Sequence, residues 1–176
     1  MTRVWDMPVR ALHWALAASV VLAWLTTEAF VRWHQLVGWA ALAIVVARLV
    51  WGFAGNRHAR FASFMRGPRP TLRYAALALR GKEPRYLGHN PLGAAMMVAL
   101  LFVVVALALT GWLYTTDVFW GDAAVELLHR VFAWTIVALA LLHVAGVALA
   151  SARHRENLVA AMVHGDKRAA DAGDID

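Results

Sequence analysis

The chain contains no cysteine and little charge. The lack of cysteine excludes disulfide bonds, iron–sulfur clusters held by thiolates and covalent haem attachment through a C-x-x-C-H motif. Charged residues make up 16% of the 176 residues, whereas soluble domains carry about 25%. Hydrophobic residues make up 61%, and the mean hydropathy is +0.57. This composition predicts a membrane protein with one main domain rather than a soluble domain.

The net charge of +6 is concentrated in one segment, residues 54–90. This segment holds a single acid, Glu83, against eight basic residues: Arg57, Arg60, Arg66, Arg69, Arg73, Arg80, Lys82 and Arg85. Basic loops of membrane proteins face the cytoplasm and are attracted to anionic lipids. We therefore interpret the segment as a cytoplasmic loop, with partner docking as the alternative, and we expect no nucleic-acid partner.

Four apolar segments are long enough to cross a bilayer, at about residues 9–27, 34–53, 91–114 and 123–150. Several of the nine tryptophans fall at the expected bilayer edges, as an aromatic belt would. Pro68 and Pro70 interrupt the basic loop, and a short interfacial helix is expected between them and Gly81. The links 28–33 and 115–122 carry one base, Arg32, and are expected on the opposite side.

The predicted fold is an all-α four-helix transmembrane bundle with both termini in the cytoplasm. Residues 1–160 form the membrane domain, and residues 161–176 form a polar cytoplasmic tail whose last residues are expected to be disordered. Pro8 suits the first turn of the first helix. Asp122 is expected to cap the fourth helix.

Four histidines lie in or at the ends of these apolar segments, where ionisable groups are costly and usually functional. His129 and His143 are fourteen residues apart, which is roughly 21 Å along a helix with about 40° of drift around its axis. His13 is expected at the cytoplasmic depth of His143. His34 is expected at the outer depth of His129. Depth therefore pairs His13 with His143 and His34 with His129.

Two imidazoles from different helices at one depth are what a six-coordinate haem iron requires. Small residues follow three of these histidines at about one turn (Gly38, Ala133 and Gly146), which leaves room for a flat macrocycle. Arg10, Arg48 and Arg130 lie near the proposed haem levels and are candidate partners of the haem propionates. For Arg48, fourteen residues after His34, the alternative is that the side chain extends to the lipid head groups.

Other interpretations of the histidines remain open. Each one alone could be a hydrogen-bonded core residue. Imidazole also suits zinc or copper, but those ligands must converge within a few ångströms. His58 and His164 are expected in solvent, and His154 just past the membrane. His89 precedes a helix-start signal, Asn90-Pro91, so capping or a local hydrogen bond is favoured over ligation.

Several motifs resemble the bacterial cytochrome b561 family, which includes the b-type cytochrome subunits of nickel–iron hydrogenases. They are VWDMPVRALHW (residues 4–14), HQLVGW (34–39), RLVWGF (48–53), YLGHNPLGA (86–94), LTGW (109–112) and SARHRENLVAAMVHGDKR (151–168). The resemblance covers nearly the whole chain. It implies two b-type haems whose axial ligands fall on His13, His34, His129 and His143.

The resulting hypothesis is a di-haem cytochrome of the bacterial inner membrane that relays electrons between the quinone pool and a redox partner, as in a respiratory chain. Candidate quinone-site residues are Arg10, Arg48 and His89. One alternative is a haem-containing anchor for a hydrogenase or a c-type cytochrome. Others are a superoxide:quinone oxidoreductase and, from another class, a metal permease. If the chain is an enzyme, the resemblance implies a quinone-linked oxidoreductase.

Overall fold

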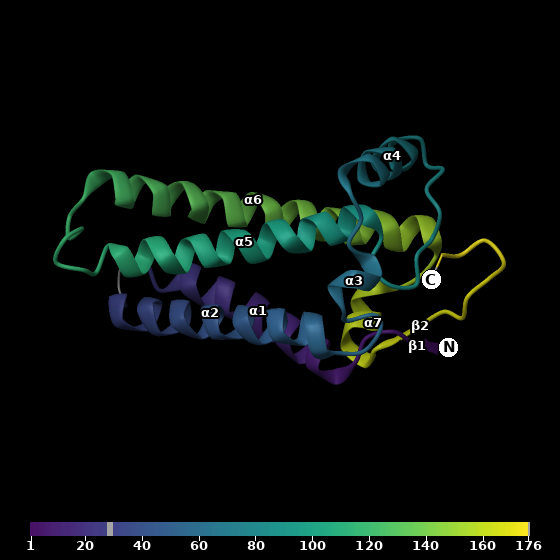
Figure 1. The fold of residues 1–176 in the computed structure, drawn as a ribbon, viewed down its shortest axis with the longest axis horizontal. Coiled ribbons are helices and arrows are strands. Elements are labelled where there is room, and N and C mark those ends of the chain that lie inside the picture. Colours follow the sequence, from purple (N-terminus) through teal and green to yellow (C-terminus); the bar gives the residue numbers. More distant parts are fainter. Residues whose placement is uncertain (28–29, 176) are drawn as a thin grey trace. The chain divides into compact units, whose positions relative to one another are not determined.

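The computed structural model describes residues 1–27 and 30–175. Within them, four helices are long and apolar enough to cross a membrane: α1 (Met7–Leu25), α2 (Val31–Ala54), α5 (Pro91–Leu113) and α6 (Ala123–His154) (Figure 1). Lipid offers backbone groups no hydrogen bonds, so apolar segments of this length satisfy their own N–H and C=O groups as helices. The predicted all-α, four-span class is confirmed.

The helix ends differ from the expected ones by up to four residues. The second helix begins at Val31, because the backbone N–H of His34 donates to the carbonyl of Phe30 at 3.0 Å. His34 therefore lies in the first turn of α2 rather than at its first residue. Part of the expected link 28–33, Glu28 and Ala29, lies outside the described residues.

Two of the predicted helix-start signals operate as expected. Asp122 Oδ1 accepts from the N–H groups of Ala124 and Val125, both at 2.9 Å, and so caps α6. Asn90 Oδ1 accepts from the N–H of Gly93 at 2.8 Å, at the start of α5. A side-chain oxygen satisfies helix N–H groups that have no carbonyl partner within the helix.

By its contacts the chain divides into two compact units, and all four long helices contribute to both. The first unit comprises Met1–Arg10, Val50–Val98 and Leu141–Asp176, and the second comprises Ala11–Leu49 and Ala99–Ala140. The second unit contains most of the membrane-spanning residues. The first contains the loop between α2 and α5 and both chain ends. Each unit is described separately below.

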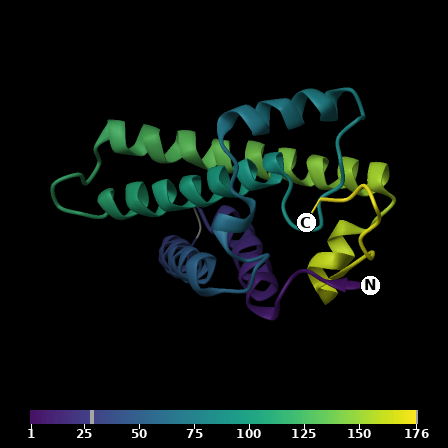
Figure 2. The same cartoon turned by 45° about the vertical axis from the view of Figure 1, so that its right-hand side comes forward.

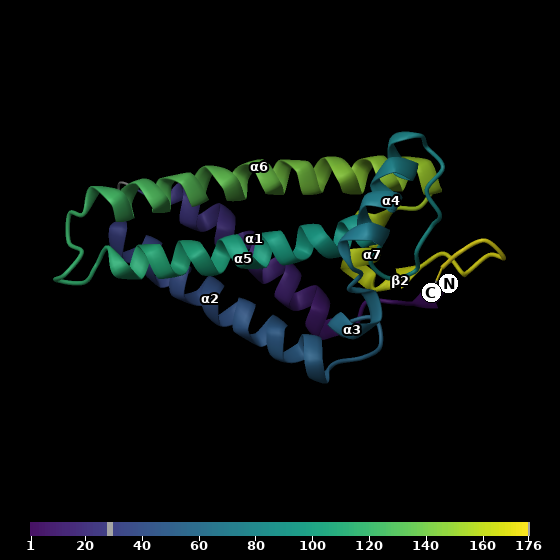
Figure 3. The same cartoon turned by 45° about the horizontal axis from the view of Figure 1, so that its top comes forward.

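In the first unit, the basic loop forms two short helices, α3 (Phe61–Phe64) and α4 (Pro68–Leu79) (Figure 3). The expected interfacial helix is therefore present, but it begins at Pro68 and includes both prolines in its first turn, where proline is tolerated. It ends before Gly81, whose φ of +64° is a conformation that favours glycine. Leu72 and Leu79 of α4 are exposed, as expected for a helix at a lipid surface.

The chain ends of the first unit are tied together. After α7 (Leu158–His164), strand β2 (Asp166–Lys167) pairs antiparallel with β1 (Thr2–Arg3), so the start of the chain lies beside its C-terminal segment (Figure 2). Further along, the N–H of Ile175 donates to the carbonyl of Arg85, and the carbonyl of Ile175 accepts from the N–H of Leu87. Both hydrogen bonds are 2.9 Å long. The expectation that the last residues are disordered is therefore wrong for residues 166–175, because they are hydrogen-bonded to distant segments.

A small buried core joins the N-terminal segment to the loop and tail of the first unit. It consists of Val4, Trp5, Val9, Ala59 and Ala161. The neighbouring Asp6 uses Oδ1 to accept from the N–H of Val9 at 2.9 Å, which caps α1. Its Oδ2 accepts from Trp51 Nε1 at 2.9 Å and from Asn56 Nδ2 at 3.2 Å. These bonds link the start of α1 to the end of α2.

Candidate functional site

The second unit brings two of the predicted histidines together. His34, in the first turn of α2, and His129, in the second turn of α6, have ring centres 6.1 Å apart, with an angle of 74° between the ring planes. Both residues are partly buried. The two residues are 95 positions apart in the chain, so the packing of α2 and α6 creates this pair.

The ring of His34 is held in one orientation by the end of α1. Its Nδ1 lies 2.8 Å from the carbonyl oxygen of Ala23. A carbonyl oxygen can only accept a hydrogen bond, so Nδ1 carries the proton in this contact. In the neutral ring Nε2 then has a free lone pair and is the atom available to bind a metal.

The ring of His129 is held in the same way by α5. Its Nδ1 lies 3.0 Å from Thr110 Oγ1. The single hydroxyl proton of Thr110 is directed to the carbonyl of Ala106, at 2.7 Å, so the hydroxyl accepts from the Nδ1–H of His129. The Nε2 of His129 is consequently also a lone-pair donor, and a second hydrogen-bond partner of this kind is typical of metal-binding histidines.

Thr110 and Gly111 are site residues that the sequence analysis did not single out. Thr110 is buried, at 8% exposure. A Cβ on Gly111 would lie 3.2 Å from Cε1 of His129, closer than ordinary van der Waals contact. Both residues belong to the LTGW segment, which entered the sequence analysis only as a family motif. The signal was a threonine followed by a glycine near the end of a long apolar helix.

The His34–His129 pair fits a haem iron. Imidazole nitrogens bind metals at about 2 Å, so two imidazoles that held one iron between their Nε2 atoms would have ring centres roughly 6 Å apart. The observed 6.1 Å agrees with this value. Gly38, one turn after His34, has no heavy atom of another residue within 4 Å of where a Cβ would lie. The space directly beside Gly38 on α2 is therefore open.

The other two histidines belong to different units. His13 lies in α1 within the second unit, and its ring is edge-on to the ring of Trp14, with centres 5.1 Å apart. His143 lies in α6 within the first unit and is partly buried. Gly146, three residues after His143, also has no heavy atom of another residue within 4 Å of where a Cβ would lie. The pairing of His13 with His143 stays a prediction.

The three arginines predicted near the haems have different surroundings. Arg48 is buried in α2 at 7% exposure. Arg10 donates through Nη2 to the carbonyl of Val163, while its Nε is buried without a hydrogen-bond partner among the described residues, so it is available to an acceptor such as a propionate. Arg130 is exposed and forms an ion pair with Glu126, one turn earlier, at 2.5 Å.

The remaining histidines, His58, His89, His154 and His164, belong to the first unit. His89 packs between the rings of Trp5 and Phe64, with centres 4.7 and 4.4 Å away. His164 is half-exposed and lies 3.9 Å from Asp166. Within residues 1–27 and 30–175, no group of three or more histidine, aspartate or glutamate side chains could hold a metal ion.

The fold and the site together define the class of the molecule. It is a four-span helical membrane protein in which two imidazoles from different helices, each with its Nδ1 engaged by the protein, have ring centres 6.1 Å apart. The chain belongs to the prokaryotic cytochrome b561 family, whose model matches residues 4–165. It is therefore a membrane b-type cytochrome, a haem b protein of electron transfer in the bacterial inner membrane.

Curated relatives agree with this assignment. The chain is similar to the probable Ni/Fe-hydrogenase B-type cytochrome subunit of Rhodobacter capsulatus, at 26% identity over 93% of this chain and 80% of that protein. The equally named protein of Bradyrhizobium diazoefficiens is 22% identical over 94% and 85% of the two chains. That of Azotobacter chroococcum is 25% identical over 92% and 86%. No solved structure matches the chain.

The hydrogen bond from His129 to Thr110 leads to a first prediction. An acceptor on Nδ1–H makes an imidazole a stronger donor to the metal and so favours the ferric state. We expect Thr110→Val to raise the midpoint potential of one haem by roughly 30–60 mV, since 59 mV corresponds to tenfold in a one-electron equilibrium. Thr110→Ser keeps the hydroxyl and should stay near the wild-type potential. Redox titration followed by visible absorption measures this.

The matched control for Thr110→Val is Thr135→Val. Thr135 Oγ1 also donates to a carbonyl of its own helix, that of Val131 at 2.8 Å, so the same group and the same kind of bond are lost. An equal shift in both variants would show that Thr110 acts through the helix and not through His129.

Proposed function

We propose that the protein binds two haems b and relays electrons across the membrane between the quinone pool and a redox partner. The observation that carries the proposal is the His34–His129 pair, with a ring spacing of 6.1 Å and both Nδ1 atoms engaged by the protein. His34 and His129 would hold one haem through their Nε2 atoms. The iron of a bound haem supplies reversible one-electron transfer.

The second haem is proposed between His13 and His143. His143 follows His129 by fourteen residues on the continuous helix α6, so the two ligands are roughly 21 Å apart along the axis and share a face. Two axial imidazoles on each iron leave no coordination position for another ligand, so the chain's own ligands favour electron relay over bond chemistry.

The proposed orientation places both termini in the cytoplasm. The excess of basic residues in segment 54–90 supports this orientation. The pairing of β1 with β2 places Thr2 beside Lys167, which supports both ends lying on one side, as four spans require. The haem held by His13 and His143 would then be the cytoplasmic one.

A quinone site is proposed near this cytoplasmic haem, with Arg10, Arg48 and His89 as candidate residues. His89 lies between two aromatic rings at the start of α5, and a quinone carbonyl accepts hydrogen bonds from a histidine or arginine N–H. Arg48 and Arg10 are also the candidate propionate partners at this level, with Arg130 at the outer one.

The redox partner is proposed to be a peripheral redox enzyme, with a c-type cytochrome as the alternative. The names of the relatives, Ni/Fe-hydrogenase B-type cytochrome subunits, support a peripheral redox enzyme as the partner and, as the alternative function, a haem-containing membrane anchor. Co-purification of a stable partner with the full chain would favour the anchor. Quinone reduction by the isolated chain would favour a stand-alone oxidoreductase.

The haem count is the direct test of the proposal. We expect a pyridine haemochrome spectrum of the purified chain to show protohaem at about two per chain, because four axial histidines serve two irons. Expression must supply haem, and protein concentration should be taken from amino-acid analysis. A count of about one would remove the second haem from the proposal and leave the His34–His129 site as the only one.

A further inference from the structure

Helix α4 (Pro68–Leu79) of the first unit carries an exposed apolar stripe. Leu72, Ala76 and Leu79 follow one another at intervals of four and three residues, so they lie on one face of the helix. All three are exposed, and Leu72 and Leu79 expose 70% and 88% of their surface. The part of the chain that the structure describes therefore leaves this leucine stripe uncovered.

A basic stripe runs beside the leucine stripe. Arg69, Arg73 and Arg80 follow one another at intervals of four and seven residues, and Arg80 keeps a helical conformation as the C-cap. Helical geometry places this arginine stripe roughly 75° around the axis from the leucine stripe. The three arginines are exposed, and among the described residues their side chains form no ion pair or hydrogen bond. Their charge is thus open to a ligand outside the chain.

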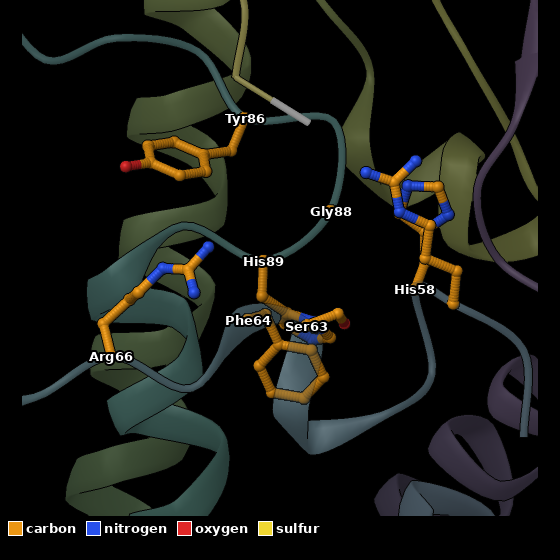
Figure 4. A pocket seen from close by; sticks show the side chains of 8 residues that line it. His58, Ser63, Phe64, Arg66, Tyr86, Gly88 and His89 are labelled. Carbon is orange, nitrogen blue, oxygen red and sulfur yellow. The ribbon is translucent and has the colours of Figure 1, made fainter. Parts of the chain in front are cut away.

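The remaining side of α4 faces the protein. Tyr74 is buried at 6% exposure, and its ring is edge-on to the ring of Tyr86, with centres 5.7 Å apart. Tyr86 belongs to the segment between α4 and α5 (Figure 4). This contact limits the rotation of α4 about its own axis, so that the leucine and arginine stripes are both directed away from the protein.

The C-terminal end of α4 is attached to the end of a membrane span. Arg153, in the last turn of α6, donates through Nη1 to the carbonyl of Ala78 at 2.5 Å and forms an ion pair with Glu83 at 2.8 Å. Helix α6 is a candidate span. The attachment therefore holds α4 beside the end of a span, at the level where phospholipid head groups surround a membrane protein.

We infer that α4 binds the surface of the bilayer and selects anionic phospholipids. The leucine stripe enters the boundary between head groups and acyl chains, and the arginine stripe contacts the phosphate groups, as in interfacial amphipathic helices. The charge of the basic loop alone fits either lipid or an acidic protein. The leucine stripe next to the arginines, and the attachment of α4 to a span, favour lipid. The inference does not depend on the haems.

The test follows the surroundings of a label on the leucine stripe. The chain contains no cysteine, so Leu79→Cys provides a single site for an environment-sensitive NBD fluorophore. The labelled, haem-loaded full chain is reconstituted into phosphatidylcholine vesicles with or without phosphatidylglycerol. We expect phosphatidylglycerol to shift the emission to the blue and to make it quenchable by lipids with spin-labelled acyl chains. The matched control is Ala170→Cys, an exposed tail residue of the same unit, whose label should stay in water.

The contribution of the arginine stripe is measured in the same labelled chain. Replacing Arg69, Arg73 and Arg80 by glutamine should lower the ratio of inserted to withdrawn label in phosphatidylglycerol vesicles by about fivefold for each arginine, the effect of a basic residue near an anionic surface. Replacing the same three residues by lysine retains the charge and should keep most of the response. An unchanged haem spectrum shows that both variants remain folded.

Three outcomes would overturn the inference. The first is an equal response to phosphatidylglycerol in the glutamine variant and in the labelled chain with its arginines intact. The second is a label that stays in water in both kinds of vesicle. The third is a spectral change when polyglutamate is added to the phosphatidylcholine vesicles, with none caused by phosphatidylglycerol, which would assign the arginine stripe to an acidic protein partner.

Discussion

We expect His34→Ala and His129→Ala each to lose the same haem b and to retain the other. The two ring centres are 6.1 Å apart, and each ring is held through Nδ1 by a different neighbour, Ala23 or Thr110. Removing either imidazole leaves the iron with one axial ligand, and a b-type haem has no covalent bond to retain it. The haem content should fall from about two to about one per chain in both variants.

Potentiometric titration identifies which haem is lost. His34→Ala and His129→Ala should leave the same remaining midpoint potential, and His13→Ala and His143→Ala should leave the other one. His164→Ala is the matched control, because this half-exposed histidine of α7 lies in the first unit beside Asp166, and its haem content should equal that of wild type. If the single variants His13→Ala and His34→Ala lost the same haem, the pairing by depth would be wrong.

We expect Arg85→Met to lower the free energy of unfolding by about 3 kcal/mol. Arg85 is buried and is the centre of a cluster that holds the C-terminal tail. Its guanidinium contacts Glu156 at 2.6 Å, Asp174, and the carbonyl of Arg168 at 2.9 Å. The exposed fractions of the three ionised side chains are 4%, 6% and 8%. Removing the cation leaves two buried carboxylates without their counter-ion, which costs more than the pair itself contributes.

Denaturant titration of the detergent-solubilised chain measures this loss, and limited proteolysis should cut the tail of Arg85→Met first. Arg80→Met is the control, because Arg80 is exposed at the end of α4. Arg85→Met combined with Glu156→Gln should be less destabilised than the sum of the two single variants, since no unpaired charge remains at that position. Additive losses would mean that Arg85 acts by packing alone.

The same cluster determines how acid affects the tail. Burial alone would raise the pKa of Glu156, but the hydrogen bonds from Arg85 and from the N–H of Arg168 hold it below its ordinary value. The N–H of Asp171 and then Arg85 hold the pKa of Asp174 below its ordinary value, against the effect of burial. For acids with lowered pKa values, the stabilisation is complete above their ordinary pKa values and is lost as the pH falls through the lowered ones. Arg85→Met should show a weaker loss of stability over that acid range.

Burial lowers the pKa of Lys167 to about 8, although Glu156 and Asp174 raise it in part. Its Nζ lies 5.7 Å from the centre of the Trp5 ring and donates to the carbonyl of Tyr86 at 3.4 Å. Lys167 therefore joins the N-terminal segment, the end of the basic loop and the tail, next to the Arg85 cluster. The tail is an integral part of the first unit.

The sequence by itself determined the features that depend on local interactions. The four spans follow from runs of apolar residues, because only a helix satisfies its own backbone in lipid. The caps at Asn90 and Asp122 follow from side chains that reach N–H groups two or three residues away. The family could also be inferred from its motifs, and the family model confirms it.

The tertiary structure decided what depends on contacts between distant segments. Depth had suggested His34 and His129 as partners, but only the packing of α2 and α6 sets the 6.1 Å between their rings. The roles of Thr110 and Gly111 depend on α5 facing His129. The order of the tail depends on Arg85, which lies 71 residues before Glu156 and 89 before Asp174. Periodicity and composition report on neighbours within a few residues, whereas such contacts form only when separate helices pack together.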